Sequence, residues 1–352
     1  MVREHENPPG TTRSGSVTIS DVARMAHVGV ATVSRVLNNS PKVSPKTAAR
    51  VRRVLERTKY RPAYAARALA RGQTNTIQLI YNTHAEKLSM DPVLLSILDV
   101  AHAELQRSGY RLVFSAIKSD FSEVSSGVLH VVEHRVADAA LLVSARMTDA
   151  GLERLRGQPL VLLDADGKGI VSSVTNDHYR AMCKAVDMLA ERGHRRIGLV
   201  WSGAIDQNES ERRRAYHDEM KRRGLPCRPE WEFICETPMR SLRDGLASRD
   251  RPTALACTSI PPVPQILDVL AAHGLDVPRD VSLLAVDSAP EGNPALTGPL
   301  RPISRHYLQW DSIVHTAMKE VLAVARGDRR IRHVVLPVPF RDEGSVAPPP
   351  VS

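Results

Sequence analysis

At positions 30–38, the sequence VATVSRVLN predicts a short helix with one face suited to specific recognition of another molecule. Val33, Val36 and Leu37 recur at helical spacing and form its expected buried side. The residues left on the other side are Val30, Ala31, Ser34, Arg35 and Asn38. Small side chains let a helix approach base edges, and a guanidinium can donate two hydrogen bonds to O6 and N7 of guanine. Hydroxyl and amide groups can hold phosphates and fix the register. This face therefore predicts contact with a DNA groove.

A preceding helix must hold that face in place. Thr18 is expected to cap it, and Asp21, three residues on, completes a capping box. Val22, Ala23 and Ala26 share one side at helical spacing, so this first helix is expected to pack rather than to read bases.

A turn and a third helix complete the predicted unit. The turn is expected at 27–29, with Gly29 supplying backbone freedom. Ser44 and Pro45 mark the start of a third helix that runs through Lys59. Its expected inward residues are Val51, Val54 and Leu55, and its outward residues are Arg50, Arg52, Arg53 and Arg57. Two short helices joined by a turn form a weakly specific pattern, so the continuation after residue 38 carries the interpretation.

Charge is concentrated at the same end of the chain. The whole sequence carries a formal net charge of +9, and residues 1–72 contain 14 Lys/Arg against 4 Asp/Glu. The remaining residues are close to neutral. A basic segment on a neutral body is typical of a small nucleic-acid-binding module, although a solvated basic surface would give the same count.

The motifs of residues 17–72 resemble those of the lactose-repressor (LacI/GalR) family of bacterial transcriptional regulators. The matching runs are DVAxxAxVxxATVSRVLN, VSxxTxxRV and YxPxxxARxL. The resemblance implies a homodimer that binds a near-palindromic, double-stranded operator, most often as a repressor. Val30, Ala31 and Arg35 would touch base edges. The residues expected to hold the DNA backbone are Thr18, Ser20, Thr32, Ser34 and Asn38.

The resemblance also implies a hinge at 60–72 that becomes helical when two copies pair over the operator. Leu69 falls where the family wedges a leucine into a minor-groove step, which unstacks bases and bends the duplex. An ordinary core leucine is the alternative interpretation of Leu69. The family usually has asparagine after the hinge proline, whereas this chain has Ala63, and the lost cap weakens hinge folding by on the order of 1 kcal/mol.

From Thr76 onward the pattern changes to alternating strands and helices, which predicts parallel sheets covered by helices. Strands are expected at 77–81, 111–116, 139–143, 160–164, 197–201, 254–257 and 283–286, and helices at 92–108 and 178–192. By resemblance, the fold class is multidomain. A small all-α helix-turn-helix domain precedes an α/β core that is similar to periplasmic binding proteins and has two doubly wound subdomains.

The expected boundaries follow from these patterns and from the resemblance. They are a disordered arm at 1–16, a DNA-binding domain at 17–59, a hinge at 60–72, a core N-subdomain at 73–192 plus 302–332, a C-subdomain at 193–301 plus 333–345, and a loose tail at 346–352.

A small-molecule effector would bind between the subdomains, off the carboxyl ends of the strands. Arg212 matches the family's cleft arginine, with a solvated arginine as the alternative. Asp177 matches the family's cleft aspartate, with a helix cap as the slightly favoured alternative. Ser259 and Ile260 replace the family's Asn-Asp pair, and an apolar side chain cannot bind sugar hydroxyls. The regulator is therefore expected to use a non-sugar effector or to act without one.

Other function classes find little support in the sequence. Motifs for a Walker loop, a GxGxxG turn, a GxSxG elbow and HExxH are absent, so no enzyme activity, cofactor or metal site is expected. The four cysteines match no paired CxxC pattern, and three of them are expected to be buried thiols. The polar N-terminus does not resemble a signal peptide, and no apolar run is long enough to span a membrane. These features predict a cytoplasmic location and argue against a secreted solute-binding protein.

Overall fold

The computed structural model describes residues 17–37, 40–60, 73–82, 92–117, 137–143, 148–203, 207–236, 239–287 and 303–350. The chain divides into two compact units, Met1–Thr74 and Asn75–Ser352. The predicted arm at 1–16, residues 61–72 of the predicted hinge, and Asn38 lie outside the described residues. None of the helices within the described ranges is long and apolar enough to cross a membrane.

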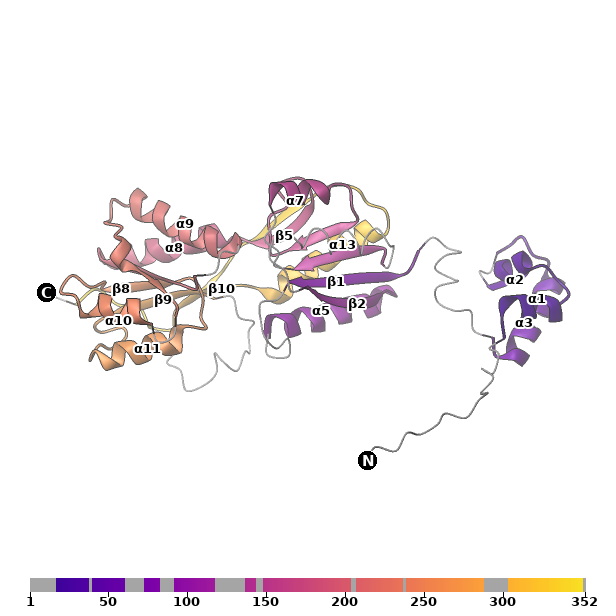
Figure 1. Cartoon of the computed structure of the whole chain (residues 1–352), viewed down its shortest axis with the longest axis horizontal. Helices are drawn as coiled ribbons and strands as arrows, with labels where there is room; N and C mark the ends of the chain where they lie inside the picture. The colour runs from indigo at the N-terminus through magenta and orange to yellow at the C-terminus, as the bar shows by residue number, and fades with distance from the viewer. Residues whose placement is uncertain are drawn as a thin grey trace, which may run out of the picture. The chain divides into compact units, whose positions relative to one another are not determined.

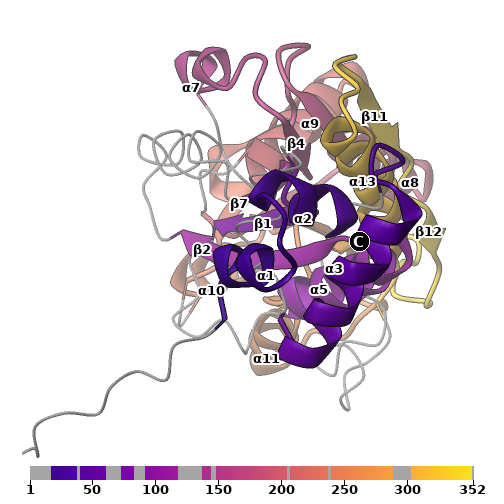
Figure 2. The same cartoon turned by 90° about the vertical axis from the view of Figure 1, so that its right-hand side faces the viewer.

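The described residues of the N-terminal unit form three helices, α1 (Ile19–Met25), α2 (Val30–Leu37) and α3 (Pro45–Thr58), which are grouped together in Figure 2. All three contribute to one small core. Its buried residues are Val22, Ala23, Ala26, Val33, Val36, Val51 and Val54. These are inward positions that helical periodicity predicts, and Leu37 and Leu55 are half-buried against the same core.

Local hydrogen bonds set the helix starts as the sequence predicts. The Thr18 hydroxyl accepts a bond from the Asp21 N–H (3.2 Å), and the Asp21 carboxylate accepts one from the Thr18 N–H (3.0 Å). The Ser44 hydroxyl accepts from the Thr47 N–H (3.3 Å) and caps α3, which has Pro45 as its first residue. Each cap satisfies a backbone donor that has no partner within its helix.

The turn between α1 and α2 differs from the prediction. His27, rather than Gly29, has the left-handed conformation, with φ 52°. The Gly29 carbonyl instead accepts bonds from the N–H groups of Thr32 (2.9 Å) and Val33 (3.3 Å) and so begins α2. An ideal Cβ at Gly29 would meet no atom within 4 Å. The prediction for Gly29 was wrong because glycine is only the most common occupant of the left-handed region.

In the larger unit, the strands within the described ranges form two six-stranded sheets (Figure 1). The first sheet has the order β11-β5-β4-β3-β1-β2 and is parallel throughout. Its strands are β1 (Thr76–Asn82), β2 (Arg111–Ile117), β3 (Ala139–Val143), β4 (Leu160–Leu163), β5 (Ser172–Asn176) and β11 (His333–Leu336). Its helices are α5 (Pro92–Ser108), α7 (Asp149–Arg154) and α13 (Trp310–Ala325).

Both faces of the first sheet are covered, because alternate residues of a strand point to opposite faces. In β1, Ile77 and Leu79 belong to the core that includes α5 and α13. Ile80 belongs to the core on the other face, with Leu152 of α7. The near-continuous apolar runs of β1, β3 and β4 follow from this two-sided burial.

The second sheet has the order β12-β10-β9-β8-β6-β7, with only the β10–β12 pair antiparallel. Its strands are β6 (Ile197–Trp201), β7 (Glu232–Ile234), β8 (Ala254–Cys257), β9 (Ser282–Asp287), β10 (Arg305–Tyr307) and β12 (Phe340–Arg341). In Figure 1, α8 (His178–Glu191) and α9 (Gln207–Arg222) cover one face, and α10 (Arg240–Ala247) and α11 (Val263–Ala272) cover the other.

The chain passes between the two sheets at points other than those predicted. Helix α8 packs on α9 and on β8, β9 and β10, so the first crossing falls before residue 178 rather than near 193. Strand β10 lies in the second sheet although 302–332 was assigned to the N-subdomain, and β11 lies in the first sheet although 333–345 was assigned to the C-subdomain. The family resemblance gave the positions of these crossings only approximately. Strands as short as β10 and β11 have no sequence feature that indicates which sheet they join.

The first residues of the predicted C-terminal tail, Val346 and Ala347, are bonded to the core. The carbonyl of Val346 accepts a bond from Arg192 Nη1 (3.0 Å), and the Ala347 N–H donates to the Ser282 hydroxyl (3.0 Å). The carbonyl of Ala347 lies 2.8 Å from His194 Nε2. The prediction of a loose segment is therefore wrong for these two residues, because proline-rich composition does not prevent backbone groups from finding partners in the core.

Stability should fall in mild acid because of His306, a side chain of β10 that is 2% exposed and packs on Phe340. Burial lowers the pKa of His306 to about 4 from its ordinary value of 6.5. The folded state therefore favours the neutral imidazole. Below pH 6.5 the unfolded state binds this proton more readily than the folded state, so the free energy of unfolding decreases until the pH reaches the folded pKa. The free energy of unfolding attributable to His306 should be about 2–3 kcal/mol lower at about pH 4.5 than at about pH 7.5.

Urea unfolding of the full chain at both pH values tests this expectation. His306→Leu should reduce the pH dependence, whereas His102→Gln, at an exposed position of α5, should leave it unchanged. An unchanged pH dependence in His306→Leu would contradict the assignment.

Candidate functional site: a nucleic-acid interface and a buried polar cluster

Helix α2 presents the predicted reading face to solvent. Val33 and Val36 are buried in the three-helix core, so the opposite side of the helix points outward. Val30 is 44% exposed, which is high for a valine, and Ala31 and Arg35 are exposed beside it. Thr32 and Ser34 are half-exposed at the edges of this face. The arrangement combines an apolar patch, hydroxyl groups and one guanidinium on a helix narrow enough to enter a major groove.

The other residues predicted to contact DNA lie at the start of α1 or outside the described residues. Thr18 and Ser20 are exposed at the start of α1. The Thr18 hydroxyl also donates to the Asp21 carboxylate (2.7 Å), so it is already used within the capping box. Asn38 and Leu69 lie outside the described residues.

Exposed positive charge accompanies the α2 face. The four arginines of α3, Arg50, Arg52, Arg53 and Arg57, are exposed, as are Lys42 and Lys46. Such side chains attract phosphates, and displacement of the condensed counterions makes the resulting affinity depend on salt.

In the core unit, a buried polar cluster lies where strands of both sheets end. Asp164 directly follows β4 and is 4% exposed. Its Oδ1 accepts a bond from Asn176 Nδ2 (3.1 Å) and lies 2.9 Å from His178 Nε2. Its Oδ2 accepts a bond from Asn208 Nδ2 of α9 (2.7 Å). Burial raises the pKa of Asp164, but the interactions with His178, Arg212 and Asn176 outweigh it, so its pKa lies below the usual value.

Arg212 extends this cluster toward the second sheet. Its Nη2 lies 2.8 Å from His178 Nδ1, and its Nη1 donates to the carbonyl of Thr258 (2.8 Å). Because a guanidinium can only donate, His178 Nδ1 must accept, and the network assigns the ring proton to Nε2, which faces Asp164. Glu209, 4% exposed, lies 3.9 Å from Arg212 and accepts bonds from the Ser202 N–H (2.7 Å) and the Thr258 hydroxyl (2.7 Å).

A tight loop between β4 and β5 holds Asp164. Asp164 has φ 56°, a left-handed conformation that aspartate tolerates better than most residues. A Cβ on Gly167 would lie 2.0 Å from the carbonyl oxygen of Val171, so only glycine fits there. The loop therefore fixes the carboxylate at the end of the strand.

The two predicted effector residues have different positions. Arg212 is 4% exposed and belongs to the polar cluster, so it is not a solvated arginine. Asp177 caps α8, since its carboxylate accepts a bond from the Arg180 N–H (3.0 Å). Ile260 is 4% exposed and packs in the core of the second sheet. Asp164, His178 and Glu209 were not predicted from the sequence, although a polar residue directly after a parallel strand is a recognisable signal for Asp164.

Two family models match the chain. One, described as bacterial regulatory proteins of the lacI family, matches residues 18–63, and the other, described as a periplasmic-binding-protein-like domain, matches residues 186–343.

Similar proteins and structures agree with these matches. The regulator GalR of Escherichia coli K12 is 30% identical over 279 residues, which covers 77% of this chain and 79% of GalR. Catabolite control protein A of Priestia megaterium is 28% identical over 307 residues, covering 82% and 88%. Among solved structures, the lac repressor dimer bound to operator and the anti-inducer ONPF has a TM-score of 0.76 at 20% identity, covering 95% of this chain and 100% of that one.

Proposed function

This chain belongs to the LacI family of bacterial regulatory proteins and is a DNA-binding transcriptional regulator, and from that premise we propose that it is a repressor that binds a near-palindromic operator as a homodimer. Family members similar to it include proteins named as repressors. Gene regulation of this kind takes place in the cytoplasm, and it requires no enzyme activity of the chain.

The observation that carries the proposal is the exposed face of α2. Val30, Ala31 and Arg35 lie together on a helix whose opposite side is fixed in the core by Val33 and Val36. Val30 and Ala31 would make apolar contacts such as those with thymine methyl groups, and Arg35 would bind guanine. Thr18, Ser20, Thr32, Ser34 and Asn38 would hold the DNA backbone.

Dimerisation follows from the size of this reading face. One short helix reads only a few base pairs, so two copies related by two-fold symmetry would recognise two half-sites. The lac repressor structure that resembles this chain is a dimer on its operator. The hinge at 60–72 would enter the minor groove between the half-sites, with Leu69 as the wedge.

Effector control is proposed at the buried polar cluster. Arg212 would be the residue that senses an effector, and Asp177 would support it by capping α8. The guanidinium of Arg212 already donates hydrogen bonds to His178 and to the Thr258 carbonyl. An effector could therefore bind Arg212 only by replacing these hydrogen bonds. This observation favours the effector-independent form of the second candidate, and the apolar Ile260 in place of the family's aspartate argues against a sugar effector.

Binding of the full chain to fragments from upstream of its own gene tests the proposal. We expect one fragment to be retained against excess random DNA, with footprints on two symmetric half-sites. The affinity should fall steeply with salt, since each phosphate contact contributes about 0.9 to the logarithmic slope. Equal affinity for every duplex, or protection of a single half-site by a monomer, would contradict it. Adding candidate metabolites to the same assay separates effector-controlled binding from effector-independent binding.

A further inference from the structure

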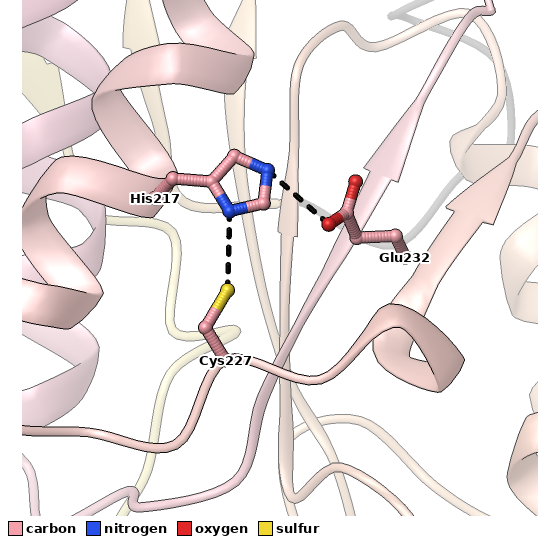
Figure 3. Close-up of side chains that lie close together, drawn as sticks. All are labelled: His217, Cys227 and Glu232. Atoms are coloured by element: carbon pink, nitrogen blue, oxygen red, sulfur yellow. Dashed lines mark hydrogen bonds and ion pairs between the residues drawn. The ribbon is translucent and has the colours of Figure 1, made fainter.

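Three side chains of types that bind metal ions lie close together beside the second sheet, outside the polar cluster (Figure 3). His217 comes from α9, Cys227 from the loop that follows α9, and Glu232 from the start of β7. The imidazole lies between the other two groups, with Nδ1 3.1 Å from the Cys227 sulfur and Nε2 3.2 Å from Glu232 Oε1. One ligand atom from each residue lies within 4.8 Å of the other two.

Two of the three side chains are held in place by rigid elements. Tyr216, beside His217, is fully buried and donates its hydroxyl to the carbonyl of Ile197 (2.8 Å), which anchors this part of α9 to β6. Glu232 is paired with Leu199 in the parallel β6–β7 ladder. Arg213 donates to Glu232 Oε2 from Nε (2.9 Å) and stacks on Trp201, so Oε1 is the oxygen of Glu232 that remains directed at His217. Cys227 is exposed on its loop and can adjust.

We propose that His217, Cys227 and Glu232 form a binding site for a divalent transition-metal ion, with zinc as the best match. Imidazole nitrogen, thiolate sulfur and carboxylate oxygen are the donors that zinc takes in proteins, at about 2.0–2.3 Å. In a tetrahedral site those bond lengths place neighbouring ligand atoms about 3.5 Å apart. The three ligand atoms now lie within 4.8 Å of one another, and small rotations of the Cys227 side chain and the His217 ring bring them to this shorter distance. Water supplies the fourth ligand.

Binding proceeds by proton release. The metal ligand is the thiolate, so the Cys227 thiol must lose its proton when the ion binds. The ion forms a bond to sulfur while the S–H bond breaks, and the proton passes to solvent. The thiolate and the Glu232 carboxylate then balance the two charges of the ion, and Arg213 remains as a neighbouring cation held by Oε2 of the same carboxylate.

No metal site was predicted from the sequence, because the four cysteines match no paired CxxC pattern and the histidines show no ligand spacing; His217, Cys227 and Glu232 are separated by 10 and 5 positions. The competing account is a simple hydrogen-bonded chain of thiol, imidazole and carboxylate that has no affinity for metal.

Titration of the metal-free full chain with Co²⁺, in a reductant that lacks thiols, tests the site. A bound thiolate gives a sulfur-to-cobalt charge-transfer absorption, and we expect it to saturate at one ion per chain and to disappear on addition of Zn²⁺. Cys227→Ser should abolish the absorption. His217→Ala and Glu232→Gln should weaken Zn²⁺ binding, measured by competition with a chromogenic chelator, by about 10-fold or more.

Cys235→Ser is the matched control, since Cys235 is a half-buried thiol of the same subdomain, and it should keep the full signal. Circular dichroism and the melting temperature of each metal-free variant verify the fold, and Zn²⁺ should raise the melting temperature of the wild type but not of Cys227→Ser. No charge-transfer absorption in the wild type, or an equal signal in Cys227→Ser, would overturn the proposal and support the hydrogen-bonded chain. Because the readout needs no DNA, its failure leaves the proposed repressor function unaffected.

Discussion

Replacing Asp164 by alanine is expected to lower the free energy of unfolding of the core unit by about 3–5 kcal/mol. The carboxylate satisfies the amides of Asn176 and Asn208 and the ring nitrogen of His178, all at the junction of the two sheets. Without it, buried donors lose their partners, and each unsatisfied donor costs roughly 1–3 kcal/mol. Alanine also tolerates the left-handed backbone at this position less well than aspartate.

Urea unfolding followed by tryptophan fluorescence and circular dichroism measures this loss. Asp164→Asn keeps the shape and the backbone preference but removes the charge, so it should lose less stability than alanine. Asp177→Ala is the comparison at a nearby helix cap, where about 1 kcal/mol is expected. If Asp164→Ala were no more destabilising than Asp177→Ala, the cluster would not hold the two sheets together in the way described.

Arg35→Ala is expected to weaken operator binding by roughly 1–3 kcal/mol, or roughly 5- to 150-fold in affinity. Arg35 is exposed on the reading face of α2 and lies away from the three-helix core, so the substitution should leave folding unchanged. The loss should concentrate at one base position in each half-site, where the preference for guanine should relax.

Competition binding with single-base operator variants measures that change in specificity. Arg53→Ala, at an exposed position of α3, is the matched control, because removal of a positive charge there should weaken binding to all sequences to a similar extent. A uniform loss in Arg35→Ala, indistinguishable from that in Arg53→Ala, would assign Arg35 to the DNA backbone rather than to a base.

The DNA-binding unit could be predicted almost completely because its determinants are local. Thr18 and Asp21 are three residues apart, as are Ser44 and Thr47, and those short spacings decide where α1 and α3 begin. The buried positions of α2 follow from its helical period. Only the turn was assigned wrongly, since His27 takes the conformation expected of Gly29.

Buried strands that are apolar throughout, such as β3 and β4, were also predictable, whereas β5 is buried but polar (SSVTN) and was not predicted. Predicted and observed bounds agree at β3, β6 and β8, and the helix expected at 92–108 matches α5. The sheet to which each segment belongs was harder to predict from the sequence. Helix α8 joins the second sheet through the packing of its apolar side, and β10 and β11 exchange subdomains relative to the predicted boundaries.

By itself, the sequence determined the family, the three helices of the N-terminal unit, the exposed face of α2 and the alternation of strands and helices in the core. Each of these depends on residues a few positions apart, whose spacing is visible along the chain. The tertiary structure alone decided where the chain crosses between sheets, and that Arg212 meets His178 and Thr258 rather than solvent. It also decided that His217, Cys227 and Glu232 converge. Contacts of this second kind join residues on separate elements, and only the packing of helices on sheets brings them within bonding distance.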